Sequence, residues 1–461
     1  MSFIYFTLLA RSLGAEAIGQ YTFALAFTTI FSIITDLGLT PVLIREIARD
    51  KTQGIRYLRN CLGVKIILEL VAYASVLTAA FLLGHPSFTL QLITIAGLIM
   101  VLDGFHLIFY GVLRGLQTLR YEAAGMIAGQ GITLILGIIF LVAHLPLYAF
   151  LIALGFGSVW NVIFSIIILR RHQITLLPAF DTRIVRFLFA TALPFAFAGI
   201  FVKVYSYIDT VLLQHLKGNI VVGWYSVPYK ITYAFQMIPM ALSAAIYPAF
   251  SSAWQDSKEK VNKLLNSAMR YSLMIVLPIT FGIAALAPEI ILTIYGIEFI
   301  NSIQPLRISI FGLIFIFLYF PLGALLNASG HQLVNTVFMG LTMATNIIIN
   351  LILIPTYSAV GASWAAVVTN AFLFFSVLIW SRRLSKISNQ TLLNALKISG
   401  AALVMLFVVQ QTKQIIAWPI TIPLGGLIYG VLLYLTKAIS RADFLELKKL
   451  FKKESIPTEV L

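Results

Sequence analysis

Long, continuous runs of apolar residues, separated by short polar connections, make up most of this chain of 461 residues. A helix that crosses a bilayer needs about 20 apolar residues. Continuous rather than alternating hydrophobicity favours helices over a transmembrane barrel. The pattern predicts an all-α integral membrane protein with about fourteen spans, at residues 1–10, 18–40, 61–83, 88–113, 120–143, 146–169, 186–214, 223–250, 268–287, 303–326, 333–354, 357–380, 391–411 and 414–436.

The composition supports this interpretation. Hydrophobic residues make up 60% of the chain and charged residues 11%, whereas a soluble domain is about 45–50% apolar and about 25% charged. The net charge of +15 would suggest a nucleic-acid partner in a soluble protein. In a membrane protein it is accounted for by basic cytoplasmic loops, and no nucleic-acid partner is expected.

Several classes of chemistry are disfavoured. The one cysteine, Cys61, allows neither an internal disulfide nor a cysteine-based metal site. The sequence contains no G-x-x-x-x-G-K-[ST] phosphate loop, no H-E-x-x-H motif and no nucleophile elbow. We therefore expect a protein that is not an enzyme, with no catalytic residue, no metal and no cofactor other than a coupling H⁺ or Na⁺.

The distribution of basic residues predicts the orientation. Connections after even-numbered spans, together with the C-terminal tail, hold 25 of the 32 lysines and arginines, whereas those after odd-numbered spans hold three. This asymmetry places both termini in the cytoplasm of a multi-pass protein of the cell membrane.

The two ends of the chain carry further expectations. The first span is short, because ten helical residues cover only about 15 Å, so we expect a truncated first helix. Residues 441–453 place Phe444, Leu447, Leu450 and Phe451 at helical spacing among basic residues. This pattern predicts an amphipathic helix on the inner leaflet, and a solvated tail is the alternative.

An internal repeat organises the spans. Gly14 and Gly19-x-Tyr21 recur as Gly218 and Gly223-x-Tyr225 at an offset of 204 residues, and Gly157-x-x-Trp160 recurs as Gly361-x-x-Trp364 at the same offset. The offset spans six helices, so the repeat is parallel. It predicts two pseudo-symmetric six-helix lobes, 1–180 and 181–388, followed by an appended pair of helices and a basic tail, 389–461. In transporters with such repeats the substrate site lies between the halves.

Ionisable residues inside spans are the candidate functional residues. Each costs roughly 3 kcal/mol at the centre of a span, so they must avoid lipid. Lys65 and Glu69 are four residues apart and can neutralise each other. Arg11 lies near a span end, where its side chain could simply reach the lipid headgroups. This structural role is the alternative to a functional one. The others within or near spans are Asp36, Arg45, Asp103 (with His106 three residues on), Lys203, Asp209 and Lys230.

Aromatic residues gather around Lys203 and Lys230. Rings that stack on sugars, and hydroxyls that bond to them, would suit a glycan, whereas an aromatic belt at the membrane interface is the alternative. The belt accounts less well for Tyr205 and Tyr233, which lie further into their spans.

Several motifs resemble those of polysaccharide (oligosaccharide-lipid) flippases of the multidrug/oligosaccharidyl-lipid/polysaccharide exporter superfamily. The opening resemblance is carried by Arg11-Ser12-Leu13-Gly14, Gly19-x-Tyr21, Asp36-x-Gly38 and Arg45. A later and looser one is carried by Asn327-Ala328-Ser329-Gly330, Asn346, Asn350, Leu353-Ile354-Pro355 and Gly361-Ala362. The likeness extends over nearly the whole chain, and the short first span departs from it.

The resemblance implies ion-coupled, alternating-access translocation of polyprenyl-diphosphate-linked oligosaccharides for surface polysaccharide synthesis. It makes Arg11 and Arg45 candidate substrate-binding residues. Our own analysis adds Lys203, Lys230, Tyr205 and Tyr233 to them. Coupling candidates are the acidic residues Asp36, Glu69, Asp103 and Asp209.

Membrane lipids, a polysaccharide polymerase and glycosyltransferases are the expected partners. Three alternative functions stay open. They are a multidrug cation antiporter of the same superfamily, a lipid II flippase, and a membrane glycan ligase or polymerase.

Overall fold

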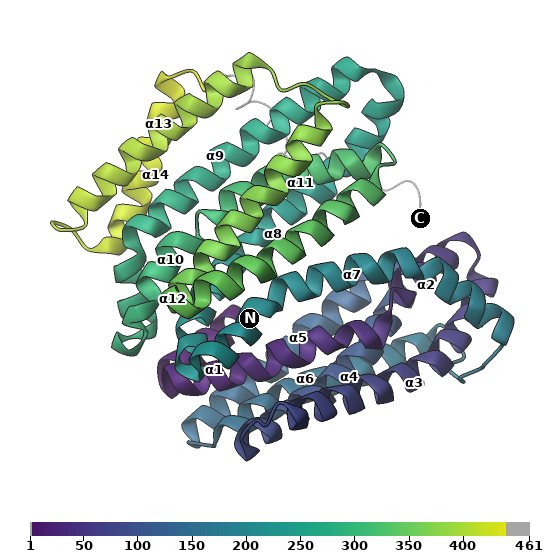
Figure 1. Ribbon diagram of the computed structural model, residues 1–461. Helices are drawn as coiled ribbons and strands as arrows, with labels where there is room; N and C mark the ends of the chain where they lie inside the picture. The colour runs from purple at the N-terminus through teal and green to yellow at the C-terminus, as the bar shows by residue number, and fades with distance from the viewer. Residues whose placement is uncertain (1, 439–461) are drawn as a thin grey trace. The chain divides into compact units, whose positions relative to one another are not determined.

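The computed structural model describes residues 2–438, which are almost entirely helical and include no strand (Figure 1). The α-helices are α1 (Ser2–Asp36), α2 (Leu39–Arg49), α3 (Lys51–Leu82), α4 (Ser87–Gly115), α5 (Leu119–Val142), α6 (Leu147–Arg171), α7 (Thr182–Lys217), α8 (Asn219–Asp256), α9 (Lys258–Ile290), α10 (Ile303–Ser309), α11 (Gly312–Ala328), α12 (Gln332–Ser381), α13 (Asn389–Thr412) and α14 (Trp418–Leu435). A π-helix (Ile291–Tyr295) and a 3-10 helix (Ile297–Ser302) connect α9 to α10. The predicted amphipathic helix at 441–453 lies outside the described residues.

The predicted all-α membrane fold is confirmed. Eleven described helices are long and apolar enough to cross a membrane, or twelve if the bent pair Ile297–Ser309 and Gly312–Ala328 forms one span. Two of these helices contain a break. One is at Gly14 in α1, within the predicted connection 11–17, and the other is at Ser358 in α12, two residues beyond the predicted connection 355–356. Gly14 has φ 79°, a left-handed conformation that glycine adopts without a steric penalty. Dividing α1 and α12 at these breaks and counting the bent pair as one span gives fourteen segments, as many as the sequence predicts.

Polar residues at helix starts explain where several spans begin. The Asp50 carboxylate accepts the backbone N–H groups of Thr52 and Gln53 at the start of α3. Asp181 does the same for Arg183 and Ile184 at the start of α7. Such caps satisfy backbone donors that lack a partner within the helix, which fixes the first turn.

The described chain forms two compact units. The first comprises Met1–Ala234, Ile291–Ser309 and Leu333–Leu373, and the second comprises Phe235–Ile290, Ile310–Gln332 and the remainder from Phe374. These units divide the chain at positions other than 180 and 388, since α7 and the first half of α8 group with α1–α6. The division into lobes by sequence repeat therefore stays a prediction.

Each unit has its own apolar core. In the first unit, buried side chains of α2, α3 and α4 pack with the end of α6 and the start of α7, where Leu39, Leu43 and Leu113 are fully buried. In the second unit, α9, α11, α13 and α14 form the core, in which Val276, Phe317 and Ile398 are fully buried. The first core thus joins α2, α3, α4, α6 and α7, and of the candidate residues Asp103 lies on α4 and Lys203 on α7.

Candidate functional site

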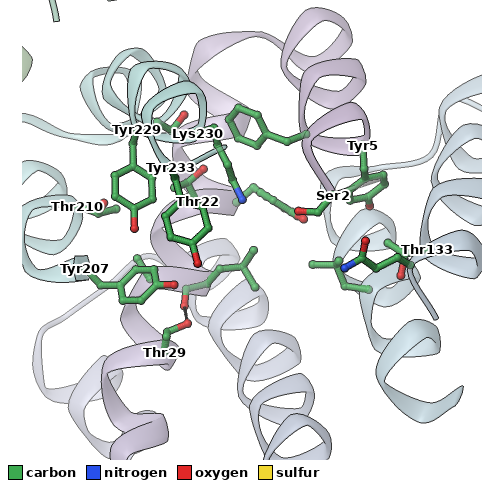
Figure 2. A pocket seen from close by; sticks show the side chains of 17 residues that line it. Ser2, Tyr5, Thr22, Thr29, Thr133, Tyr207, Thr210, Tyr229, Lys230 and Tyr233 are labelled. Atoms are coloured by element: carbon green, nitrogen blue, oxygen red, sulfur yellow. Dashed lines mark hydrogen bonds between the residues drawn. The ribbon is translucent and has the colours of Figure 1, made fainter. Parts of the chain in front are cut away.

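Two adjoining cavities lie within the first unit. The larger, of about 320 Å³, is called the tyrosine cavity here (Figure 2). It is lined by Ser2, Tyr5, Phe6, Tyr21, Thr22, Leu25, Ala26, Thr29, Gln130, Thr133, Leu154, Tyr207, Thr210, Ser226, Tyr229, Lys230 and Tyr233. The smaller, of about 250 Å³, is called the Lys203 cavity. It is lined by Leu25, Thr28, Thr29, Ser32, Thr35, Ala96, Ile99, Met100, Asp103, Gly104, His106, Leu107 and Lys203. Leu25 and Thr29 of α1 line both.

The tyrosine cavity has many hydroxyl-bearing side chains in its lining but almost no charge. Twelve of its seventeen lining residues carry an uncharged hydroxyl or amide group, and Lys230 is the one ionised side chain at neutral pH. Figure 2 shows the Lys230 side chain directed into the cavity among the tyrosines. The rings of Tyr229 and Tyr233, one helical turn apart on α8, stack with centroids 6.0 Å apart. These hydroxyl and amide groups can donate to and accept from the hydroxyl groups of a ligand.

Hydrogen bonds between helices hold this cavity in shape. The Tyr5 hydroxyl donates to the carbonyl oxygen of Phe150 at 2.7 Å, which ties α1 to α6. The Thr133 hydroxyl donates to the carbonyl oxygen of Ala153, which ties α5 to α6. Both bonds satisfy polar groups that would otherwise be buried without a partner.

The Lys203 cavity combines opposite charges. Lys203 Nζ on α7 donates to the hydroxyl of Ser32 on α1. Asp103 on α4 accepts a hydrogen bond of 2.6 Å from Ser158 on α6, and His106 Nδ1 lies 3.4 Å from the same carboxylate oxygen. Four helices thus place a lysine, a carboxylate and an imidazole around one space, a set that can bind an anion or exchange a proton.

Glu69 lies outside both cavities. Its carboxylate is 3.3 Å from Lys65 Nζ, and both side chains are buried. Lys65 also donates to the carbonyl oxygen of Thr35 at 2.7 Å. Gly104 on α4 leaves room for the Glu69 carboxylate, which occupies the space that a Cβ there would need. This contact matches the interpretation in which Lys65 and Glu69 have a structural role and neutralise each other.

The other two acidic candidates are also engaged. Asp36 accepts hydrogen bonds from the backbone N–H and the hydroxyl of Thr40, at the start of α2. Asp209 is buried on α7 and accepts a hydrogen bond of 2.6 Å from the Tyr225 hydroxyl. Neither lines the two cavities, so Asp103 is the one acidic candidate that does.

Three of the predicted substrate-binding residues bond to protein groups away from the two cavities. Arg11 donates to the carbonyl oxygens of Thr293 at 2.8 Å and Ile294 at 3.4 Å. Arg45 pairs with the adjacent Glu46 at 2.7 Å. The Tyr205 hydroxyl donates to Asn370 Oδ1 at 2.8 Å. The structure thus brings Lys203, Lys230 and Tyr233 to the cavities, and places Arg11, Arg45 and Tyr205 outside their linings.

Sequence analysis missed several residues of the two cavities, among them the lining residues Tyr5 and Ser32, and it also missed Ser158, which donates to Asp103. The repeat offers a signal for one of them. Tyr5 lies 204 residues before Asp209, and Tyr21 lies 204 residues before Tyr225. Tyr5 and Tyr21 both line the tyrosine cavity, and in the second copy Asp209 accepts a hydrogen bond from Tyr225. Serines carry no such signal, because a hydroxyl in a span can bond to its own helix.

Comparisons with known proteins give a consistent picture. The model of the family described as "Polysaccharide biosynthesis protein" matches residues 1–254, and the MatE family model matches residues 194–352. The "Probable low-salt glycan biosynthesis flippase Agl15" of Haloferax volcanii is 24% identical, over 80% of this chain and 78% of that protein. "Capsular polysaccharide biosynthesis protein CapF" of Staphylococcus aureus is 22% identical, over 83% and 95% respectively.

A solved structure shares the fold. The lipid II flippase MurJ in its inward closed conformation superposes with a TM-score of 0.75 and 16% sequence identity, over 94% of this chain and 95% of that one. At this identity the likeness concerns the fold alone.

Proposed function

Since the chain belongs to the polysaccharide biosynthesis protein family, within the multidrug/oligosaccharidyl-lipid/polysaccharide exporter superfamily, we propose that it flips a polyprenyl-diphosphate-linked oligosaccharide across the cytoplasmic membrane. The flipped unit then serves surface polysaccharide synthesis. The proposal involves no covalent chemistry, because the substrate only changes leaflet.

The charge of the two cavities is the observation that carries the proposal. Their linings include two lysines, Lys203 and Lys230, and one carboxylate, Asp103. A lipid diphosphate is anionic, and lysine ammonium groups bind phosphates by charge-assisted hydrogen bonds. The hydroxyls of the tyrosine cavity supply donors and acceptors for sugar hydroxyls.

The same observation weighs against a multidrug cation antiporter. An organic cation would favour a cavity whose lining carries net negative charge, whereas lysines outnumber carboxylates here. A lipid II flippase would need a similarly cationic site, so its distinction from our proposal rests on the substrate assay below. A glycan ligase or polymerase is the weakest alternative, because its catalysis would require acids or histidines in a large external loop.

Coupling to an ion gradient is part of the proposal. Asp103 is the strongest coupling candidate, because it lines a cavity beside His106 and Lys203. Glu69, Asp36 and Asp209 are weaker ones, because each is held by a protein partner outside the cavities. Protonation of Asp103, or binding of Na⁺ to it, would change the net charge of the Lys203 cavity by one unit. That change would alter its affinity for an anion between two conformations of alternating access.

The cellular setting completes the proposal. It includes both termini in the cytoplasm, which the excess of basic residues in the connections after even-numbered spans supports. A flippase of this kind receives its substrate from glycosyltransferases and delivers it to a polymerase, so these enzymes are the proposed partners.

The direct test uses the full chain in lipid vesicles that contain a fluorescent polyprenyl-diphosphate oligosaccharide. Movement between leaflets is scored by accessibility of the label to a membrane-impermeant quencher. We expect flipping that depends on the protein and responds to a pH or Na⁺ gradient. Flipping of lipid II alone would favour the first alternative, and efflux of an organic cation dye without flipping would favour the antiporter.

A further inference from the structure

Helix α9 of the second unit contains two prolines, Pro278 and Pro288. Because proline has no backbone N–H, it leaves the carbonyl group four residues earlier without its usual helical donor. At Pro278 this group is the carbonyl of Met274. A carbonyl without a donor is costly inside a membrane, and helices kink most often at proline. The sequence of α9 therefore contains two sites at which the helix can bend.

Helix α14 supplies the donor that Pro278 removes. The hydroxyl of Tyr429 donates to the carbonyl oxygen of Met274 at 3.0 Å, across 155 residues of sequence. The Tyr429 side chain is buried in the core of this unit, beside α9 and α13. The bond thus satisfies the same carbonyl group that the proline leaves free, and it replaces a bond within the helix by one between helices.

Helix α13 makes a similar contact at the second proline. Lys413 Nζ donates to the carbonyl oxygen of Ala285 at 2.8 Å and pairs with the carboxylate of Glu289 at 2.8 Å. Ala285 lies in the turn that Pro288 interrupts, and Glu289 directly follows the proline. One ammonium group, itself mostly buried, therefore holds the chain on both sides of Pro288.

The beginning of α9 is held by the segment that leads into α13. Asn262 Oδ1 accepts a hydrogen bond of 2.6 Å from the Ser385 hydroxyl. One turn later, Asn266 Oδ1 accepts the backbone N–H of Ser388 at 2.8 Å. Figure 1 shows α13 and α14 alongside α9, with which both are in contact. Residues 385–435 thus hold α9 at its beginning, its middle and its end.

The end of α9 is also the point at which the chain leaves the second unit. Residues up to Ile290 belong to that unit, and Ile291–Ser309 belong to the first. The chain continues from α9 as the π-helix Ile291–Tyr295, followed by Gly296 with φ 93°. A π-helical turn is a rare form that occurs frequently at functional sites. A stiff α9 transmits movement to this boundary, whereas a helix that bends at its prolines absorbs it.

We propose that residues 385–435, called the brace here, stiffen α9 at its two proline sites, so that bending during transport is confined to the boundary at 290–296. This gives a mechanical role to the helix pair that the repeat leaves outside the two lobes. The role in transport rests on the proposed function, whereas the stiffening of α9 does not. Tyr429 and Lys413 are positioning residues, because they act on α9 and line neither cavity.

A double-mutant cycle tests whether Tyr429 replaces the donor that Pro278 lacks. In Pro278→Ala the new backbone N–H can bond to the Met274 carbonyl, so the tyrosine hydroxyl is no longer needed there. We expect Tyr429→Phe to lower the melting temperature in detergent, and to lose about half of this effect or more in the Pro278→Ala background. Tyr434→Phe is the control, because Tyr434 is an exposed tyrosine of the same helix. Equal losses from Tyr429→Phe in the two backgrounds overturn the proposal.

Hydrogen exchange shows where the brace acts. Tyr429→Phe should speed the exchange of amides around Pro278, and Lys413→Met that of amides around Pro288. Helix α3 of the first unit should exchange as in the wild type, because local opening is confined to the segment that has lost its contacts. Equally faster exchange in α3 and α9 indicates a general loss of stability and contradicts the proposal, as does unchanged exchange in α9.

The flipping assay measures the consequence for transport. The double variant Tyr429→Phe/Lys413→Met should flip lipid-linked oligosaccharide about threefold more slowly per folded protein, because α9 now absorbs part of the movement. Unchanged flipping with faster exchange in α9 overturns the role of the brace in transport. A wild type that flips no lipid-linked oligosaccharide loses the proposed function, while the mutant cycle and the exchange data still decide whether the brace stiffens α9.

Discussion

Gly19 in α1 and Gly223 in α8 form a reciprocal contact between two helix backbones. A Cβ atom at Gly19 would overlap the carbonyl oxygen of Asn219, and one at Gly223 would overlap the carbonyl oxygen of Ala15. Ala15 and Asn219 are separated by 204 residues, as are the two glycines. The contact therefore maps onto itself when the two copies of the repeat are exchanged, as a two-fold relation between them requires.

This contact predicts that Gly19→Ala destabilises the protein. The new methyl group must push two backbones apart, and overpacking of this kind costs about 1–3 kcal/mol. The melting temperature in detergent should fall measurably. Gly131→Ala on α5 is the matched control, because a Cβ there meets nothing within 4 Å. An unchanged melting temperature for Gly19→Ala would show that α1 and α8 do not pack as closely as described.

The Lys65–Glu69 pair predicts a strong asymmetry between single and double variants. Glu69→Gln leaves the buried Lys65 without a counter-ion, which costs about 3–5 kcal/mol. The double variant Lys65→Met/Glu69→Leu removes both charges and should regain most of that stability. Melting temperatures of the three proteins test this expectation. Lys260→Gln, which breaks the exposed Lys260–Asp256 pair, should change the melting temperature little.

The position of Arg11 predicts a role in holding the segment 291–302. Besides the two carbonyl contacts of Arg11, the carboxylate of Glu298 accepts the backbone N–H of Ala15 at 3.3 Å, and the Trp224 indole donates to the Glu298 carbonyl oxygen at 3.0 Å. Arg11→Gln should therefore increase hydrogen exchange in residues 291–302 and leave anion affinity within about twofold of the wild type. A tenfold loss of anion affinity without faster exchange would instead place Arg11 in the substrate site.

Asp103 provides a test of ion coupling that is separate from substrate binding. Asp103→Asn keeps an acceptor for the Ser158 hydroxyl but removes the charge that a proton or Na⁺ would neutralise. Flipping should continue without a gradient and lose most of its response to one. Glu69→Gln, assayed after correction for the amount of folded protein, should keep that response. A variant at Asp103 that responds to the gradient like the wild type would remove this residue from the coupling site.

Asp181 predicts a pH dependence of stability. The backbone N–H groups of Arg183 and Ile184, together with Arg56, hold the pKa of its carboxyl below the usual value, which is about 3.9. A carboxyl whose pKa is lower in the folded state contributes stability above the unfolded pKa, and that stability is lost as the pH falls through the folded value. Asp181→Ala should therefore lower the melting temperature at pH 7, and this effect should shrink as the pH falls through the lowered pKa of the folded state. A melting-temperature difference between the two proteins that stays constant throughout an acid titration would contradict the charged cap.

Much of the architecture could be predicted from the sequence because bilayer thickness sets the length of a spanning helix. The apolar runs predicted fourteen segments. The break at Gly14 lies in the predicted connection 11–17, whereas the break at Ser358 lies two residues beyond the predicted connection 355–356. The repeat was visible because Gly14 and Gly218 share an extended, positive-φ conformation that favours glycine. These features are local, so a residue pattern records them.

The sequence by itself thus determined the class of protein, the order of its helices and the set of buried charges. Only the tertiary structure decided which charges share a space. Lys65 and Glu69 pair away from the cavities, Lys203 meets Ser32 across 171 residues of sequence, and Lys230 faces hydroxyls without a carboxylate. The reason is that nearly uniformly apolar helices lack a polar face that would reveal their orientation, so the direction of each side chain is set by packing against neighbouring helices.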